Sequence, residues 1–219
     1  MNKNNKYASI QNTIVYIVLF IIICLPIYSV AQSCHGFLAY GIPGKSDQFL
    51  CREGYSVGYS YRYKQALWVA YKLTTQSVNN RIKRRDNFKP DREIPKRYRA
   101  NLADYVRSKY DKGHLAPYAA MDFNGKSADQ SFLLSNMSPQ KPGLNRQAWA
   151  QLESYVRFWG GYKSIVYVYT GPIMGGNPKT IGRGVAVPNN FYKIIYAPKQ
   201  QEAIAFEMPN KRISKKKVS

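Results

Sequence analysis

The sequence predicts one α+β domain built mainly on an antiparallel sheet. The chain has 219 residues, which suffices for one domain with a sizeable core and is short for two. Residues 55–63 alternate between aromatic or apolar and polar positions, the pattern of a strand with one buried face. Residues 148–159 instead repeat apolar side chains at spacings of three and four, which is typical of an amphipathic helix.

The N-terminus has the features of an export signal. Lys3 and Lys6 precede an apolar run over residues 14–27. A small-x-small pattern at residues 29–31 then matches a cleavage site. We therefore expect residues 1–31 to be a signal peptide, and the mature protein to be secreted or periplasmic with no stable membrane association.

Two other interpretations of this segment stay open. One is an uncleaved membrane anchor, although the apolar run is shorter than the roughly 20 residues that span a bilayer, and Pro26 interrupts it. The other is a mitochondrial presequence, although such segments are rich in Arg and the first Arg of this chain is Arg52.

The cysteines agree with export. Cys24 lies inside the predicted signal, which leaves Cys34 and Cys51 as an even pair. In an oxidising compartment such a pair predicts a disulfide. The alternatives are two unlinked thiols, or a lipid attached to Cys34, for which residues 31–33 are a poor match.

The net charge of +21 at pH 7 predicts an anionic partner. Removal of the signal would leave 31 basic against 12 acidic residues, a net charge of +19. Nucleic acid, an acidic glycan and a membrane face all fit, because long-range attraction acts on any polyanion.

The first half of the chain predicts two strands and a basic loop. Residues 55–63 form the half-buried strand, whose aromatic stripe could alternatively stack on bases. Residues 66–74 are more continuously apolar and predict a central strand. Residues 81–112 hold twelve Lys or Arg and five acidic residues. This loop is either a solvated surface or, because it leads into the candidate site, a phosphate contact.

The next stretch predicts strand, strand and helix. Residues 111–116 and 132–135 each fit a short strand, and Pro142-Gly143 marks a turn. The helix over residues 148–159 should end at Gly160-Gly161.

The last part of the chain predicts three further strands, of which the final two form a hairpin. They are residues 164–170, 191–197 and 203–206. Residues 211–219 form a basic tail that we expect to be disordered, so the domain should span residues 32–210.

Elimination selects His114 as the candidate general base. The chain has two histidines, and His35 lies a few residues past the expected cleavage site. A neutral imidazole, with an unperturbed pKa near ~6.5, accepts a proton at neutral pH. A lone histidine is more often structural, but Gly113 permits close backbone approach beside it. Asp111 and Lys112 add charges of both signs.

Asn145 and Glu153 are candidates for holding a metal ion. They lie about 80 degrees apart around a regular helix, so both can face one side with Trp149 between them. An amide oxygen suits a magnesium-type ion that keeps most of its waters, and Glu153 could hydrogen-bond those waters. The structural alternatives are a helix N-cap for Asn145 and a turn residue for Asn136.

A set of spaced motifs resembles one family. The motifs are Asp111-Lys112-Gly113-His114-Leu115-Ala116-Pro117, Ser135-Asn136 with Pro139-Gln140, and Leu144-Asn145 with Trp149 and Leu152-Glu153. Together they resemble the DNA/RNA non-specific endonucleases of the ββα-metal, or His-Me finger, class. The resemblance spans roughly residues 55–206 and implies an antiparallel sheet that carries a ββα-metal catalytic motif.

The resemblance also implies residue roles. His114 would be the general base that activates water. Asn145 would be the single direct protein ligand to Mg²⁺, with Mn²⁺ as the alternative ion. Glu153 would organise the waters of the ion, and Asn136 would support the site.

An upstream arginine should bind phosphate, and both Arg84 and Arg85 lie near the matching position; Arg85 is the one assigned here. Lys112 is a departure, because the family usually has Arg there and Lys offers a point charge in place of a planar donor. The chain also stops soon after Phe206, where the family commonly continues, which we expect to weaken the fold or affect a dimer.

These features predict an exported, metal-dependent endonuclease that hydrolyses phosphodiester bonds of DNA and RNA. The family resemblance implies products that carry 5′ phosphates. Contacts to the phosphate backbone suffice for substrate binding, so no sequence specificity is expected. One rival is a non-catalytic nucleic-acid-binding protein of the same fold at the cell surface, and another is a basic envelope or glycan-binding protein. A homodimer is also left open.

Overall fold

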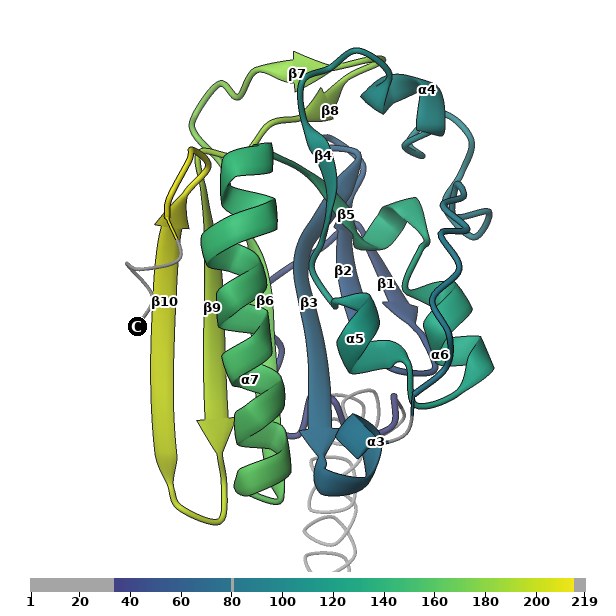
Figure 1. Cartoon of the computed structure of the whole chain (residues 1–219). Helices are drawn as coiled ribbons and strands as arrows, with labels where there is room; N and C mark the ends of the chain where they lie inside the picture. The colour runs from purple at the N-terminus through teal and green to yellow at the C-terminus, as the bar shows by residue number, and fades with distance from the viewer. Residues whose placement is uncertain (1–33, 80, 215–219) are drawn as a thin grey trace, which may run out of the picture.

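The structure is a computed structural model that describes residues 34–79 and 81–214 (Figure 1). Its α+β architecture is centred on a six-stranded sheet in which all neighbouring strands are antiparallel, which confirms the predicted fold class. The predicted signal peptide, residues 1–31, lies outside the described residues. In the part of the chain that is described, no helix is long and apolar enough to cross a membrane.

The strands of the sheet lie in the spatial order β1-β2-β3-β6-β9-β10. Their bounds are β1 (Gln48–Cys51), β2 (Ser56–Ser60), β3 (Gln65–Thr74), β6 (Ile165–Ile173), β9 (Asn190–Ala197) and β10 (Glu202–Pro209). The predicted central strand is β3, and the predicted final hairpin is β9 and β10. Both predictions are confirmed.

The remaining elements are short, apart from one long helix. They are α3 (Thr75–Asn79), α4 (Leu102–Tyr105), β4 (Asp111–His114), α5 (Tyr118–Met121), α6 (Gly125–Gln130), the 3₁₀ turn η1 (Leu134–Asn136), β5 (Met137–Gln140), the π-helical turn η2 (Leu144–Trp149), α7 (Ala150–Tyr162), β7 (Thr180–Ile181) and β8 (Val185–Ala186).

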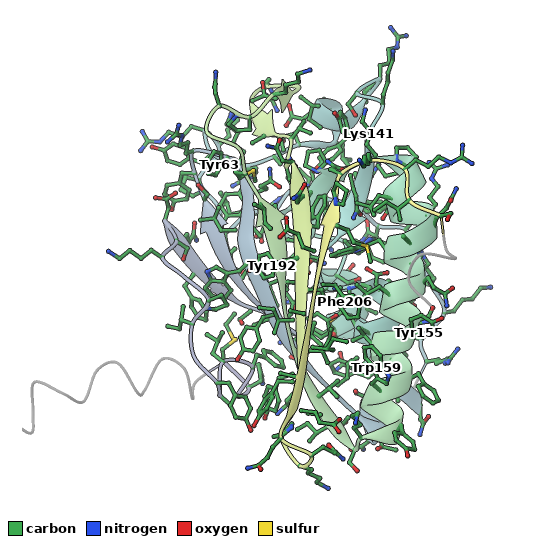
Figure 2. All side chains as sticks on the ribbon, turned by 90° about the vertical axis from the view of Figure 1, so that its left-hand side faces the viewer. Tyr63, Lys141, Tyr155, Trp159, Tyr192 and Phe206 are labelled. Carbon is green, nitrogen blue, oxygen red and sulfur yellow. A yellow bond between two sulfur atoms is a disulfide. The ribbon has the colours of Figure 1, made fainter. Side chains whose placement is uncertain are left out.

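Helix α7 lies across one face of the sheet, beside the ribbon formed by β4 and β5 (Figure 1). The main core fills the space between them and includes Trp149 and Leu73. Figure 2 shows Trp159 of α7 near Phe206 of β10, and their ring centroids are 6.5 Å apart. The helix is therefore fixed on the sheet by aromatic and aliphatic packing, which gives the site a rigid base.

Strand β2 is more buried than the alternation predicted. Tyr55, Val57 and Tyr59 are fully buried in the main core, and every residue of β2 is buried. The prediction of a half-buried strand was therefore wrong, because the opposite face is covered as well: the ring of Trp68 packs directly over Gly58. The alternative role in base stacking fails for these three side chains, since none is accessible.

The predicted strand over residues 132–135 was wrong. Leu134–Asn136 forms a 3₁₀ turn, and the strand that pairs with β4 is Met137–Gln140. Pro139 argued against a strand in the sequence because proline cannot donate a ladder hydrogen bond. A two-stranded ribbon tolerates it, since each strand has a free edge.

The predicted helix end was also wrong. Helix α7 runs through Gly160 and Gly161 to Tyr162, and the chain turns at Ser164, which has a φ of 69°. A Cβ on Gly160 would lie 2.7 Å from Cβ of Leu73 on β3. The glycine is therefore required for close helix-to-sheet packing and does not end the helix.

The basic stretch of residues 81–112 is mainly loop, as predicted, with α4 as its one helix. The tail differs from expectation where it is described. The backbone N–H of Ile213 donates to the carbonyl of Gly143 at 3.2 Å, and Ile213 packs against the main core. Residues 211–214 are thus held against the start of η2, and 215–219 lie outside the described residues.

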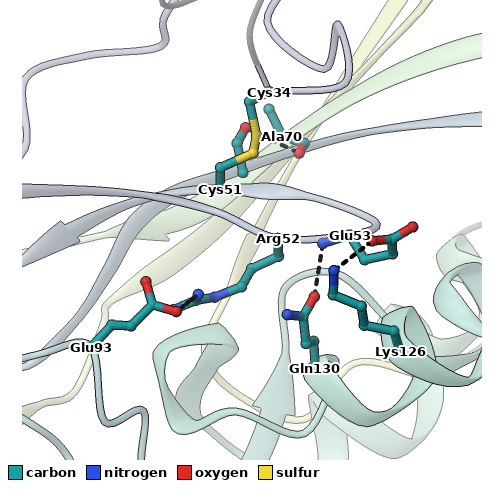
Figure 3. Close-up of a disulfide and its surroundings, with 9 residues drawn as sticks. Cys34, Cys51, Arg52, Glu53, Ala70, Glu93, Lys126 and Gln130 are labelled. Carbon is teal, nitrogen blue, oxygen red and sulfur yellow. Dashed lines mark hydrogen bonds and ion pairs between the residues drawn. A yellow bond between two sulfur atoms is a disulfide. The ribbon is translucent and has the colours of Figure 1, made fainter.

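A disulfide joins Cys34 to Cys51, as predicted, and excludes both alternatives for these cysteines (Figure 3). It closes a loop over a sequence separation of 17, which stabilises the fold by about 3 kcal/mol. Next to it, the buried guanidinium of Arg52 pairs with Asp91 at 2.5 Å and also with Glu93. The N-terminal edge of the sheet is therefore tied to the loop that leads to the candidate site.

Candidate active site

Strand β4 places His114 at the end of the β4–β5 ribbon, opposite Met137. Its neighbour Gly113 faces Ser138 and lies tightly against Gln140, since a Cβ on Gly113 would be 2.7 Å from Cβ of Gln140. Only glycine allows this approach. The predicted role of Gly113 in close backbone packing beside the histidine is thus confirmed.

Asn136 fixes the backbone that follows His114. Its side-chain oxygen accepts from the backbone N–H of Ala116 at 2.9 Å, and its amide donates to the carbonyls of Ala116 at 2.8 Å and Ser131 at 2.9 Å. The side chain is fully buried and does not line the pocket. These three hydrogen bonds hold the neighbouring backbone in place, as those of a positioning residue do. They go beyond what the alternative role, a simple turn residue, would require.

The support behind Asn136 reaches back to the disulfide region. Ser135 donates its hydroxyl to the Asp91 carboxylate at 2.6 Å, and that carboxylate also pairs with Arg52. Both Asp91 and Arg52 are 3% exposed. Breaking one partner of such a buried pair is strongly destabilising, so the turn that carries Asn136 is well fixed.

The ring of His114 sits among aromatic side chains. It packs edge-on against Phe132, with ring centroids 5.4 Å apart, and is tilted against Phe88 at 5.6 Å. Burial, and then the nearby cation of Arg84, lower the pKa of His114 to about 3. The side chain as a whole is partly exposed, but its Nε2 atom is buried and has no hydrogen-bond partner in the described part of the chain. His114 is therefore neutral near pH 7 and able to accept a proton.

Asn145 projects from the π-helical turn η2, and not from a regular helix as predicted. Its amide donates to the Asp111 carboxylate at 2.9 Å, and the N-cap of this segment is Gly143. The alternative of an N-cap role is therefore wrong. A carboxylate only accepts hydrogen bonds, so the side chain of Asn145 must turn its NH₂ group toward Asp111. The amide oxygen of Asn145 is then available to bind a ligand.

Asp111 was not predicted to have this function. Arg146 also donates to it, at 2.7 and 2.9 Å. Burial alone would raise the pKa of Asp111, but the hydrogen bonds from Arg146 and Asn145 outweigh it and lower the pKa. The ionised carboxylate thus ties β4 to η2. Its position on a strand directly before the lysine and histidine was the signal in the sequence.

Glu153, in the first turn of α7, faces the same pocket as Asn145. Burial raises the pKa of Glu153 to about 7, while the charges of Lys193 and Arg157 oppose the rise. A π-helical turn stands between Asn145 and the regular helix, so the predicted angle of about 80 degrees does not apply directly. The expectation that both side chains face one side is nevertheless met.

Two of the predicted cations face the pocket. The Arg84 guanidinium lies over the rings of Tyr118 and Phe132, at 5.4 and 5.5 Å, and pairs with Asp86. The Lys112 ammonium lies 4.7 Å from the centroid of Phe88. Both residues line the pocket that holds His114.

Arg85 does not line this pocket and instead borders a neighbouring one. The structure therefore places Arg84, and not Arg85, in the pocket with His114.

Together these side chains line a single polar pocket of about 380 Å³. It brings together Arg84, Lys112, His114, Asn145 and Glu153. In the described ranges no cluster of three or more His, Cys, Asp or Glu could hold a metal ion. The oxygen donors of Asn145 and Glu153 fit a hard cation that keeps most of its waters, which is how Mg²⁺ binds.

A buried lysine behind the pocket was missed. Lys193 on β9 is fully buried, its Nζ lies 4.6 Å from the ring of Trp149, and it has no hydrogen-bond partner in the described part of the chain. Burial lowers the pKa of Lys193 to about 8, and Glu153 opposes this effect. The alternation in residues 191–197 already placed Lys193 on the same face as Phe191 and Ile195.

Comparison with known proteins gives consistent matches. Residues 35–219 match the model of a family described as DNA/RNA non-specific endonuclease. Nuclease C1 of Cunninghamella echinulata var. echinulata is 37% identical over 203 residues, which are 85% of this chain and 81% of that protein. Endonuclease G, mitochondrial, of Homo sapiens is 36% identical over 186 residues, 78% of this chain and 62% of that protein.

Two further comparisons agree. The mitochondrial nuclease of Saccharomyces cerevisiae is 36% identical over 208 residues, 82% of this chain and 62% of that protein. The chain thus spans less than two thirds of the length of its yeast and human relatives. A chain in the crystal structure of the EndoG/EndoGI complex superposes with a TM-score of 0.76 at 33% identity, over 85% of this chain and 81% of that one.

The low pKa of His114 predicts that stability falls in acid. The unfolded chain binds a proton near pH 6.5 and the folded chain only near pH 3, so protonation favours unfolding between these values. The loss is at most about 1.4 kcal/mol per pH unit. Urea unfolding of wild type and His114→Gln should show a steeper decline for wild type as the pH falls from about 6.5 to about 4.5.

The exposed His35 provides the matched control. His35→Gln should follow the wild-type pH dependence. If the unfolding free energies of wild type and His114→Gln fell in parallel with pH, the pKa of His114 would be the same in the folded and unfolded chains, which would contradict the prediction.

Proposed function

Because the chain belongs to the DNA/RNA non-specific endonuclease family, we propose that it hydrolyses phosphodiester bonds of DNA and RNA without sequence specificity, with His114 as general base and Mg²⁺ held at Asn145. The family and the enzyme class are those that the spaced motifs predicted, and both are confirmed. The specific substrate, ion and residue roles are our proposal.

The observation that carries the proposal is the convergence of His114 and Asn145 on one pocket from different elements. His114 comes from strand β4 and Asn145 from the turn before α7, and Asp111 joins the two elements. A neutral base and an oriented amide oxygen then face the same space, with Glu153 beside them. Non-catalytic binding to nucleic acid would require neither.

In the proposed reaction, His114 accepts a proton from the water that attacks phosphorus in line with the departing 3′ oxygen, so 5′ phosphates result. Arg84 and Lys112 bind the phosphate and offset its charge. Asn136 and Gly113 hold the histidine in register, and Asp111 orients Asn145. Asn145 and Glu153 would hold Mg²⁺, with Mn²⁺ as the alternative, and the bound ion would supply positive charge that stabilises the transition state.

Substrate selection follows from the charge. The basic residues around the pocket contact phosphate groups, which DNA and RNA share, so neither base sequence nor sugar needs to be read. Lys112 provides one donor group where an arginine would provide a planar pair. We propose that it binds phosphate with less geometric control, which lowers the rate without abolishing it.

We also propose that the protein is exported. The Cys34–Cys51 disulfide supports an oxidising compartment, although several relatives are named as mitochondrial. Expression in the native host should yield an extracellular or periplasmic protein with Gln32 at its N-terminus, as determined by mass spectrometry. Protein that retains residues 1–31, or that is found inside an organelle, would contradict export.

Replacing His114 should abolish cleavage while substrate binding persists. Loss of a general base costs about 10²- to 10⁴-fold in rate, whereas the cations that bind phosphate remain. Plasmid and RNA degradation by His114→Ala should fall by this factor, with binding measured by fluorescence anisotropy unchanged. His35→Ala, which alters the other histidine, should retain wild-type activity. A fully active His114→Ala enzyme would remove His114 from the role of base.

Replacing Asn145 should weaken metal binding. EDTA should stop plasmid cleavage by the wild type, and Mg²⁺ should restore it. Asn145→Ala should need at least about tenfold more Mg²⁺ for half-maximal rate, because one direct ligand is lost. Gln147→Ala lies on the same helical turn but away from the pocket, and should match wild type. Cleavage that survives EDTA in all three proteins would refute metal dependence.

A further inference from the structure

A second pocket is lined by residues of α5, α6 and the loop of residues 81–87, and it shares Tyr118 with the candidate active-site pocket. We name it the flanking pocket. Its apolar lining includes Ile82, Ala128 and Phe132, and its basic side chains are Lys83 and Arg85. Its volume is about 530 Å³, within the roughly 300–1,000 Å³ of sites that accept small organic groups.

The flanking pocket and the active-site pocket share an aromatic wall. Tyr118 lines both of them. Phe132 lines the flanking pocket and packs edge-on against His114, with ring centroids 5.4 Å apart. The Arg84 guanidinium lies over both aromatic rings and lines the active-site pocket. A chain bound at His114 would therefore reach the flanking pocket after crossing one side-chain layer.

Consecutive cations of the loop of residues 81–87 lie on opposite sides of the aromatic wall. Arg84 lines the active-site pocket, while Ile82, Lys83 and Arg85 line the flanking pocket. The loop is anchored at both ends. Ile82 donates its N–H to the Asp122 carbonyl at 2.8 Å, and the Asn87 amide donates to the Asp129 carboxylate at 3.0 Å.

The charge of the flanking pocket is suited to phosphate. Lys83 and Arg85 are exposed, and within the described ranges neither forms an ion pair with a carboxylate. The single carboxylate on its lining, Asp129, is already paired with Lys89. Two unpaired cations over an apolar floor match a nucleotide, which joins an anionic phosphate to a flat ring with apolar faces.

We propose that the flanking pocket is a subsite for the nucleotide next to the scissile phosphate. Lys83 and Arg85 bind the adjacent phosphate, and the base or sugar rests on Ile82 and Ala128. This inference rests on the proposed function, because it assumes that the scissile diester lies at His114. In this proposal Arg85 binds the substrate one nucleotide away from the reacting phosphate, and Arg84 remains at the reaction centre.

The test compares a small phosphodiester with a longer one. Bis(4-nitrophenyl) phosphate fills the active-site pocket alone, whereas a single-stranded oligonucleotide extends into the flanking pocket. Lys83→Ala and Arg85→Ala should each lower kcat/KM for the oligonucleotide about tenfold, the value of a lost charge-assisted hydrogen bond. Each should also reduce the slope of log kcat/KM against log salt concentration by about 1, the value expected for one lost phosphate contact. Hydrolysis of the small diester should not change.

Ile82→Asp adds a carboxylate to the apolar floor at a side chain that is already exposed. It should impair oligonucleotide cleavage at least as much, again without affecting the small diester. Lys199→Ala removes an exposed lysine from the β9–β10 turn, at the edge of the sheet away from α5 and α6 (Figure 1), and should behave as wild type on both substrates.

The outcomes separate the subsite from the proposed function. Oligonucleotide kinetics of Arg85→Ala and Lys83→Ala that match Lys199→Ala would overturn the subsite. Equal losses on both substrates would also overturn it, since they would place these cations at the reaction centre. A wild-type enzyme that cleaves neither substrate would refute the proposed function itself.

Discussion

The hydrogen bond from Asn145 to Asp111 is the interaction on which the candidate site depends. It links strand β4, which carries His114, to the turn that begins α7, and these elements lie 34 residues apart in sequence. The ionised carboxylate also fixes which way the amide points, because it accepts and cannot donate. Packing alone would bring the two elements together without orienting the amide oxygen. One acidic side chain thus joins the ribbon to the helix and orients the amide oxygen that we propose as the metal ligand.

A second constraint comes from charge buried behind the pocket. Trp149 holds α7 on the sheet, and the ammonium of Lys193 lies 4.6 Å from its ring without a hydrogen-bond partner in the described residues. Burial pushes the pKa values of Lys193 and Glu153 in opposite directions, each toward its neutral form, and their mutual attraction resists both shifts. A cation–π contact compensates only part of the desolvation of an ammonium. Burial of these two groups therefore costs stability near the first turn of α7, and groups with such shifted pKa values are typical of functional sites.

Much of this arrangement follows from the sequence, and the exceptions have physical causes. Periodicity located β3, β9, β10 and most of α7, because buried faces dominate those elements. It failed for β5, where the pattern held a proline, and at Gly160, where close packing on Leu73 outweighs the low helix propensity of glycine. The spaced motifs located His114, Asn145 and Glu153. Neither method revealed that Asp111 orients Asn145, since a hydrogen bond between distant elements depends on tertiary geometry and leaves no local pattern.

The choice between Arg84 and Arg85 is the simplest example of what the sequence alone does not predict. Both residues are arginines in one basic run, and adjacent side chains of a loop can enter different pockets. Local sequence does not determine which of them faces His114. The path of the loop is fixed by its anchors, Ile82 to Asp122 and Asn87 to Asp129, which involve residues about 40 positions away. In this conformation Arg84 lines the pocket of His114, and Lys83 and Arg85 line the flanking pocket. The basic run is therefore divided between two pockets by backbone geometry, and its charge acts at two places along a bound strand.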